Sequence, residues 1–406
     1  MALINVLEVS VEDESSFAEN ASDPSSNTYT TRLPVLSVEP SLTQERGESD
    51  GSLQTFLHRM RPGYLGPREG EIVLRVPWTG HITTAAGALT SNWLHALLGD
   101  GLGGSDATQV GDTAETGSTA SNLVITGGTL SNGGVVRVGA IGDGRAEGHA
   151  AVIDTYSTPN AALLTDLPAA PNNGDVVYAA LMSWLNETLG TSKRFLIGYP
   201  ETGAQWHAMG CQLKGLGFTL AQGGLPELEL TYQVAYWDRA AETIPSGDAL
   251  ESFATAALTG NSLFYQDQGT STRVLKSVTE INVSMAYELA IKRTTGGSAQ
   301  YQTITGYERG PVKTTVDFLV QDWESDHETL FDTDGPDTTL KHLLFEGQRA
   351  DGRSIGFYCP ELYPVAERPQ YDDANGITGV RATLMSTQAA DVAPTLQNTQ
   401  MALWQA

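Results

Sequence analysis

Side chains that could carry chemistry are scattered along this chain and form no motif. Its seven histidines make no HxxxH or HxxEH pair and stand near no cysteine at metal-ligand spacing. His95 and His342 fall in two segments that we predict to be helices, where we expect them to face solvent or to cap. No GxSxG nucleophile elbow and no P-loop occurs. We therefore expect no catalytic, cofactor-binding or metal-binding residue.

Three acidic or glycine-rich stretches could in principle bind a phosphate or a calcium ion or act as an acid–base pair. GDGLGGSD at 99–106 follows a predicted helix, whereas a phosphate-binding loop follows a strand. DTDGPD at 332–337 resembles the start of a calcium loop, but the continuation TTLKH supplies no further ligand, so we predict a solvated turn. Glu227 and Glu229 could act as an acid–base pair, yet they lie on a regularly alternating strand that indicates a solvent-facing row. The residues give no argument for an enzyme.

Composition favours strands and turns. The chain has 406 residues, 40% of them apolar, 17% charged and 43 glycines. A net charge of −25 argues against binding nucleic acid through Lys and Arg. Cys211 and Cys359 are too few for a disulfide framework and suit free core thiols in a reducing compartment. No signal peptide is evident, and no apolar run reaches the length of a membrane span, so we expect a protein made and used in soluble form.

One phrase is written twice. GYLGPREGEIVLRV at 63–76 and GYERGPVKTTVDFLV at 306–320 each place Gly-Tyr before Gly-Pro and then alternate apolar and polar residues. This pattern predicts a turn followed by a half-buried strand. The matching apolar residues are Ile72, Leu74 and Val76 in the first copy and Val316, Phe318 and Val320 in the second.

Further matches keep the same order. A short helix at 94–101, capped by Ser91 or Asn92 and stopped by Gly99, matches a helix predicted at 338–347. Cys359 then matches Cys211, and the closing strand in NGITGVRATLMSTQ matches the one in PELELTYQVAYW. The offset between copies falls from 246 to 148, a difference of 98 residues that only the first half contains. The chain therefore reads as an internal duplication with one insertion.

The insertion has strand signals of its own in SNLVITGG, GGVVRVGAI, HAAVIDTY and DVVYAALMSW, which predict a small β-barrel or sandwich on the outer surface that can be deleted. Residues 8–31 and 391–406 are poor in core formers and suggest flexible arms. The predicted organisation is an N-terminal arm (1–31), a first domain (32–104 and 193–245), an inserted module (105–192), a linker (246–272), a second domain (273–390) and a C-terminal arm (391–406).

The run from RFLIGYP through PELELTYQVAYW, and the run from VTEINVSMAYELAIKR through the second Gly-Tyr phrase, resemble the core of tail tube (major tail) proteins of long-tailed bacteriophages. The resemblance implies a mainly β fold: two tandem tail-tube-like β-sandwich or split-barrel domains, each with a short flanking helix. It also implies rings of six domains whose inner sheets join into one barrel. About 24 strands would give a backbone diameter on the order of 45–50 Å, enough for duplex DNA. Simple tail tube subunits carry one domain, so three chains of this protein would close a ring.

The resemblance further implies a virion protein assembled in the bacterial cytoplasm, with itself, a tape measure protein and terminator or baseplate proteins as partners, and with double-stranded DNA passing through without specific binding. Glu227, Glu229, Glu288 and Asp317 point away from apolar neighbours, so we expect them to face the channel. Leu396, Met401, Leu403 and Trp404 give the C-terminal arm apolar anchors for a neighbouring ring. The alternatives are a single-ring tail adaptor and a carbohydrate-binding β-sandwich; against the latter, Trp184, Trp206 and Trp237 are spread over separate segments.

Overall fold

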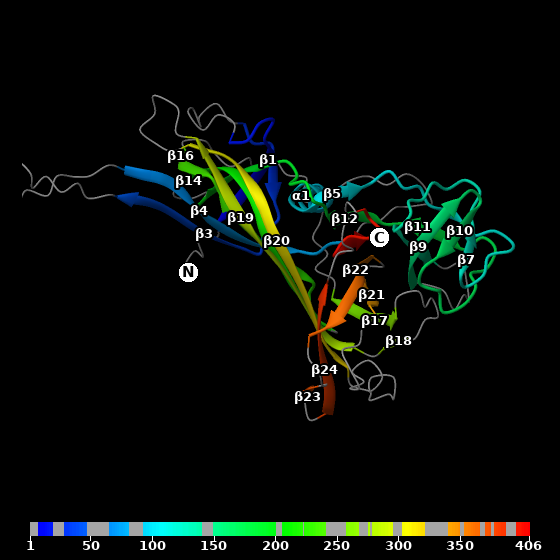
Figure 1. The fold of residues 1–406 in the computed structure, drawn as a ribbon. Helices are drawn as coiled ribbons and strands as arrows, with labels where there is room; N and C mark the ends of the chain where they lie inside the picture. Colours follow the sequence, from blue (N-terminus) through cyan, green and yellow to red (C-terminus); the bar gives the residue numbers. More distant parts are fainter. Residues whose placement is uncertain are drawn as a thin grey trace, which may run out of the picture.

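The fold is mainly β. The computed structural model describes residues 7–18, 28–46, 65–80, 92–139, 149–199, 205–221, 223–240, 257–267, 275–276, 278–294, 303–320, 340–349, 353–365, 370–374, 377–386 and 395–406. Within these ranges one helix, α1 (Trp93–Leu102), accompanies a 19-stranded sheet and a six-stranded sheet (Figure 1). No helix in the described ranges is long and apolar enough to cross a membrane.

Eight strands of the large sheet come from the first half of the chain and surround the insertion in sequence. They are β1 (Glu8–Asp13), β2 (Thr31–Leu33), β3 (Ser37–Arg46), β4 (Leu65–Pro77), β13 (Lys193–Gly198), β14 (Gln205–Ala221), β15 (Glu227–Val234) and β16 (Tyr236–Ala240). β1 pairs with β2 and β13, β13 with β14, β14 with β15 and β16, and β4 with β3 and β15.

The second half repeats these pairings. Its strands are β17 (Leu258–Asp267), β18 (Leu275–Lys276), β19 (Val278–Thr294), β20 (Thr303–Val320), β21 (Lys341–Arg349), β22 (Ser354–Pro364), β23 (Gln370–Ala374), β24 (Ile377–Ser386) and β25 (Ala402–Gln405). β17 pairs with β18 and β21, β21 with β22, β22 with β24 and β25, and β20 with β19 and β24. All seven antiparallel pairings recur, with β22 and β23 together pairing with β24 as β14 pairs with β15.

The two halves meet inside one band of strands. Its order is β3-β4-β15-β14-β19-β20-β24-β23, so each half contributes four strands. At the centre, 215–221 of β14 pair with 280–286 of β19. Among the described strands β3 pairs with β4 alone and β23 with β24 alone, which leaves these two at the ends of the band.

The repeated Gly-Pro dipeptides lie inside long strands, so the predicted turn is wrong. Gly66-Pro67 is part of β4 and Gly310-Pro311 part of β20. The register shifts at each dipeptide, and the two residues stand opposite one residue of the neighbouring strand, Glu45 in β3 and Glu288 in β19. Proline has no N–H for a ladder, and a β-bulge is where a strand tolerates it. The phrase therefore encodes the same bulge twice.

The helix predicted at 338–347 is also wrong, because residues 341–349 form β21. Leu343 and Phe345 alternate into the core, which is the period of a strand. The counterpart of β21 is β13: Lys193 stands opposite Asp13 and Cys211, and Lys341 opposite Asp267 and Leu362. Leu362 thus takes the place of Cys211, and Cys359 lies opposite Leu343 instead. The predicted match between the two cysteines is shifted in register.

α1 begins and ends at identifiable caps. The Asn92 side chain accepts a 2.7 Å hydrogen bond from the His95 N–H, which confirms Asn92 as N-cap. The helix continues through Gly99 and ends at Gly103, whose φ of 89° favours glycine, so the predicted stop at Gly99 is wrong. His95 is buried, and its Nε2–H donates to the Met182 carbonyl at 2.9 Å. His342 is buried against Phe264. The prediction that the two histidines face solvent is therefore wrong.

Residues 112–179 form the six-stranded sheet, which lies beside the second half in Figure 1. In sheet order its strands are β6 (Asp112–Thr113), β11 (Val176–Ala179), β8 (Val135–Gly139), β9 (His149–Ser157), β10 (Asn160–Leu163) and β7 (Asn122–Val124). One face of the six-stranded sheet packs around an apolar cluster of its own. Val135, Ala150 and Val152 of the same sheet belong to a second cluster, which also contains Phe264 and Trp404. The inserted module therefore completes a core that the second half and the C-terminal segment need.

Both predicted arms contain sheet strands. In the N-terminal segment, β1 lies between β2 and β13. In the C-terminal segment, β25 lies between β22 and β12 (Leu181–Leu185), and β12 also pairs with β5 (Gly103–Asp106). β25 occupies the position that β16 has in the first half. A description of residues 8–13 and 402–405 as flexible arms is therefore wrong, because each supplies a strand that its neighbours would otherwise lack.

Candidate functional site

The eight-stranded band has one apolar and one polar face. Leu228 and Leu230 of β15 are fully buried, whereas Glu227 and Glu229 lie on the opposite side of the strand. The same alternation leaves Glu288 of β19 exposed and Asp317 of β20 half-buried. All four predicted carboxylates are thus on the face turned away from the core, which we call the polar face.

One cross-strand row crosses the polar face from the first half to the second. Glu227 stands opposite Thr219, Thr219 opposite Asn282, and Asn282 opposite Asp317. The Thr219 hydroxyl donates a 2.6 Å hydrogen bond to Asn282 Oδ1, and Asn282 Nδ2 donates to Glu280 at 2.7 Å. Polar side chains therefore bridge the junction of β14 with β19 on this face.

Two of the four carboxylates have arginine partners that the sequence prediction missed. Glu229 pairs with Arg75 at 3.0 Å, and Asp317 pairs with Arg381 at 2.8 Å. Arg75 stands between Leu74 and Val76, so its parity in β4 already placed it on the polar face. Half-exposed pairs of this kind contribute about 0–1 kcal/mol each to stability. Their effect here is to neutralise part of the face.

The four carboxylates also differ in whether the other half of the chain has an acidic residue at the matching position. The register places Arg381 at the position of Glu229, and Val73 at the position of Asp317. Glu288 is matched by Glu45, each opposite a Gly-Pro bulge. Of the four predicted residues, Glu288 is the one whose charge recurs at the matching position of the other half.

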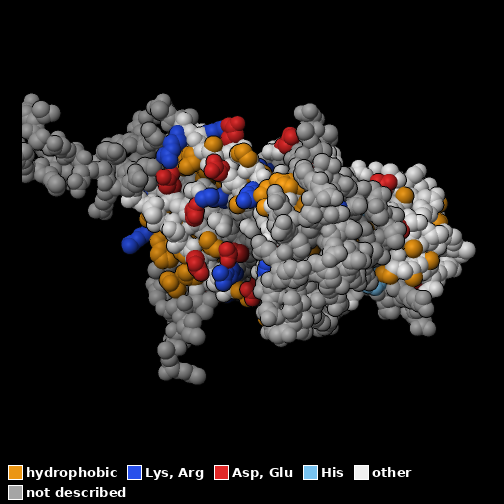
Figure 2. All heavy atoms as spheres, turned by 60° about the horizontal axis from the view of Figure 1, so that its bottom comes forward, with side chains coloured by type: hydrophobic (Ala, Val, Ile, Leu, Met, Phe, Trp, Pro, Cys, Tyr) orange, Lys and Arg blue, Asp and Glu red, His pale blue; other side chains and the backbone are white. Residues whose placement is uncertain are grey.

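An open hollow of about 700 Å³ lies over the polar face, lined by residues of both halves. Gly217 forms part of its floor, and a Cβ added there would stay 3.7 Å from the nearest heavy atom. On the face of the molecule seen in Figure 2, acidic and basic side chains are interspersed. The charged residues that line the hollow are Arg75, Glu227, Glu229 and Asp317, so acidic groups outnumber basic ones there and the lining does not favour a polyanion.

The four residues predicted as inter-ring anchors are buried in their own chain. Met401 and Trp404 are fully buried, and Leu403 and Leu396 nearly so. Trp404 and Leu396 pack with the inserted module, while Leu403 and Met401 belong to the main core. These side chains fill positions that the fold of the single chain requires, so the sequence-based role as free anchors is not retained.

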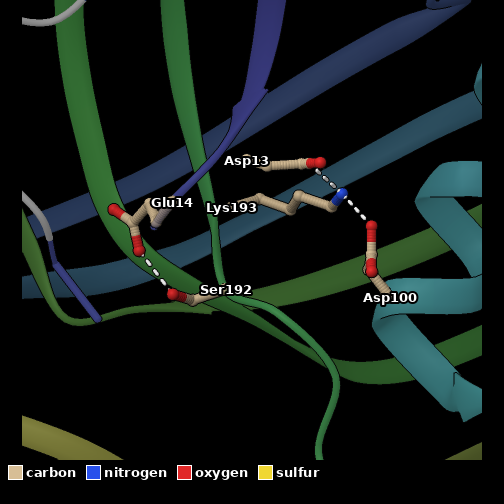
Figure 3. A network of polar contacts seen from close by, with 5 residues as sticks. All are labelled: Asp13, Glu14, Asp100, Ser192 and Lys193. Atoms are coloured by element: carbon tan, nitrogen blue, oxygen red, sulfur yellow. Dashed lines mark hydrogen bonds and ion pairs between the residues drawn. The ribbon is translucent and has the colours of Figure 1, made fainter. Parts of the chain in front are cut away.

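A second polar group lies inside the first half, where β1, α1 and β13 meet (Figure 3). Lys193 is only 3% exposed and forms ion pairs with Asp13 and Asp100. Next to it, Glu14 accepts hydrogen bonds from the Ser192 hydroxyl and from the Gly210 N–H at 2.9 Å. These contacts fasten β1 and α1 to β13.

The chemistry of this buried group is structural. Burial raises the pKa of Glu14, although the hydrogen bonds from Gly210 and Ser192 oppose that shift. Cys211, which stands opposite Lys193, has its pKa raised well above the usual value by burial and by the Glu14 charge. A buried thiol kept protonated is a poor nucleophile. We assign this group to anchoring rather than to catalysis.

Within the described ranges no three His, Cys, Asp or Glu side chains gather as a metal site. The acidic turn at 332–337 lies outside the described residues. No family model matches the chain, and no curated protein matches it. We therefore take the polar face of the band as the candidate functional site.

Proposed function

We propose that this chain is the structural subunit of a bacteriophage tail tube, in which three chains close a ring of six repeated units and rings stack into a tube. The observation that carries the proposal is the eight-stranded band. It contains one four-stranded unit twice, joined head to tail, and the strand at each end has no further strand partner among the described residues. A head-to-tail contact is heterologous, and such contacts generate rings or filaments.

In this proposal the polar face lines the channel. Six four-stranded units would supply about 24 strands, enough for a barrel that passes duplex DNA. The row through Thr219 and Asn282 would then be repeated around the lumen. The net charge of −25 would let DNA slide, because counterion release at basic residues is what holds phosphates and acidic residues are in large excess here. A tape measure protein would occupy the same channel before DNA does.

A single-ring tail adaptor is the second candidate, and one observation favours it. The C-terminal residues expected to reach a neighbouring ring are buried in their own chain. Inter-ring contacts would then have to come from other segments. Negative-stain microscopy of the purified protein separates the two: tubes support the tail tube, single rings the adaptor, and monomers neither.

A further inference from the structure

The two ends of the eight-stranded band match the two strands that already pair at its centre. In the first half, β3 and β14 are the outer strands of the four-stranded unit; in the second half, β19 and β23 are. β14 and β19 are hydrogen-bonded within the chain. β23 and β3 are the same two edges, left without a strand partner among the described residues.

We propose that β23 of one chain pairs antiparallel with β3 of a second copy of this chain, in the register that joins β14 to β19. This proposal rests on the ring assembly proposed above and names its inter-chain seam. Transferring the register is direct. Gly217 stands opposite Glu229, and Gln370 stands opposite Arg381, the residue that matches Glu229 in the other half. Likewise, Ser284 stands opposite Thr315 of β20, and Ser41 stands opposite Glu71, the matching residue of β4.

The transferred register gives specific opposite pairs. Gly217 with Ser284 becomes Gln370 with Ser41, and Ala221 with Glu280 becomes Ala374 with Ser37. Gly217, Ser284 and Ser41 lie on the polar face, so a seam in this register would continue that face from one chain to the next. The core face continues through Val38, which is 7% exposed and packs with the main apolar cluster.

Exposed apolar side chains flank both edges. Four large apolar residues are exposed in the described ranges: Leu36, Leu225, Tyr363 and Val365. Leu36 immediately precedes β3, and Tyr363 and Val365 precede β23 in the chain. Apolar groups beside an open strand edge are a liability unless a partner covers them.

Two prolines limit what the open edges accept. Pro40 lies within β3, where a proline is tolerated because the strand is at an edge. Directly after β22, the Val365 N–H donates to the Thr383 carbonyl at 3.0 Å, which turns the nitrogen of Pro364, the last residue of β22, toward the open side. Each proline removes one donor from the edge. The seam is therefore selective for a partner in one register and weaker than the β14–β19 junction.

Disulfide trapping tests the register. A chain with Ser41→Cys and Gln370→Cys should form inter-chain disulfides on mild oxidation, because directly opposite residues have Cβ atoms about 4.5–5.5 Å apart. Products of two and three linked chains are expected on a non-reducing gel. The native Cys211 and Cys359 are fully buried and do not contribute.

Two further variants serve as controls. Gly217→Cys with Ser284→Cys sits at the same register within one chain and should form an intra-chain disulfide. Ser41→Cys with Tyr371→Cys is displaced by one residue, which turns one thiol to the opposite face. It should link chains several-fold less. Rings in the microscope with no excess linking of the 41–370 variant over the 41–371 variant would overturn the seam but leave the ring. Absence of any oligomer would overturn both.

Discussion

Thr219, in the first half of the chain, donates a 2.6 Å hydrogen bond to Asn282, in the second half. The two residues are register partners at the junction of β14 with β19. On the other face of that junction Phe218 and Val283 are buried in the main core. The halves are therefore joined as two neighbouring strands of one sheet, with a dry side and a polar side, and not by a linker alone.

This junction predicts that both halves unfold together. Phe218 makes edge-to-face contacts with Trp78 of its own half at 4.8 Å and with Phe357 of the other half at 5.3 Å. Phe218→Ala should lower the free energy of unfolding by about 3–5 kcal/mol, because it leaves a cavity between the halves. Chemical denaturation followed by fluorescence and by circular dichroism should show one shifted transition for both probes.

The matched control is Leu225→Ala, since Leu225 is 50% exposed at a turn of the same half. An exposed substitution should change the free energy of unfolding by no more than about 0.5 kcal/mol. Two separate transitions in the Phe218 variant, only one of them shifted, would contradict a core shared by the halves.

Deleting the inserted sheet should destabilise the second half. Replacing 112–179 by a short Gly-Ser linker would uncover Tyr358, Phe264 and Trp404, which pack with Val135 and Val152. Each large side chain exposed in this way costs about 1.5–3 kcal/mol. The melting temperature of the deletion variant should fall, and dye binding to exposed apolar surface should rise. Unchanged melting would show that the module is dispensable, as the sequence had suggested.

Glu14 should give stability a specific pH dependence. Its pKa is raised in the folded protein by burial, so the folded state keeps the proton to higher pH than the unfolded state does. The protonated form therefore stabilises the fold at low pH, and this contribution is lost as pH rises through the folded pKa. Glu14→Gln has no such titration. As pH rises above the ordinary glutamate pKa of 4.5, the wild type should lose stability relative to Glu14→Gln in urea denaturation. An equal or opposite slope would contradict the assignment.

An element could be predicted from the sequence where its pattern is set by neighbouring residues, and could not where it depends on strands distant in the chain. Strict alternation in β15 and β19 predicted both strands and the face of their carboxylates, because a half-buried strand has a period of two. The run that contains Leu343 and Phe345 does not distinguish a helix from a strand, because leucine spacing in a short apolar run fits both. The C-terminal segment looked like an arm because its few apolar residues are buried only through partners distant in sequence, β12 and β22.

The polar face shows the same division. Parity placed Glu227 and Glu288 away from the core, but it carried no information on which strands are neighbours. The pairing of β4 with β15, which brings Arg75 to Glu229, joins residues 154 apart in sequence. The phrase around Gly66-Pro67 was visible as a repeat, yet its meaning as a bulge depended on the opposite strand.

A charge change on the polar face tests the proposed channel. Glu227→Lys with Glu288→Lys avoids the ion pairs of Glu229 and Asp317. Assembly should be preserved, since Glu227 is half-buried and Glu288 exposed on the face away from the core, where substitutions typically cost within about 0.5 kcal/mol each. Assembled tubes should now retain duplex DNA at low salt and release it at high salt, because lysines bind phosphates with counterion release. The same number of charge changes placed on the inserted sheet, Glu115→Lys with Asp154→Lys, should not. Equal retention by both variants would show that the polar face does not line the channel.

The most direct test of the central claim is the number of chains in a ring, measured by mass photometry of the purified protein alongside negative-stain images. With two four-stranded units per chain, the account predicts rings of three chains, with a mass near three times 43.3 kDa, alone or stacked into tubes. Rings of six chains would contradict the pairing of two units per chain with six units per ring. A protein that stays monomeric at every concentration would contradict assembly itself.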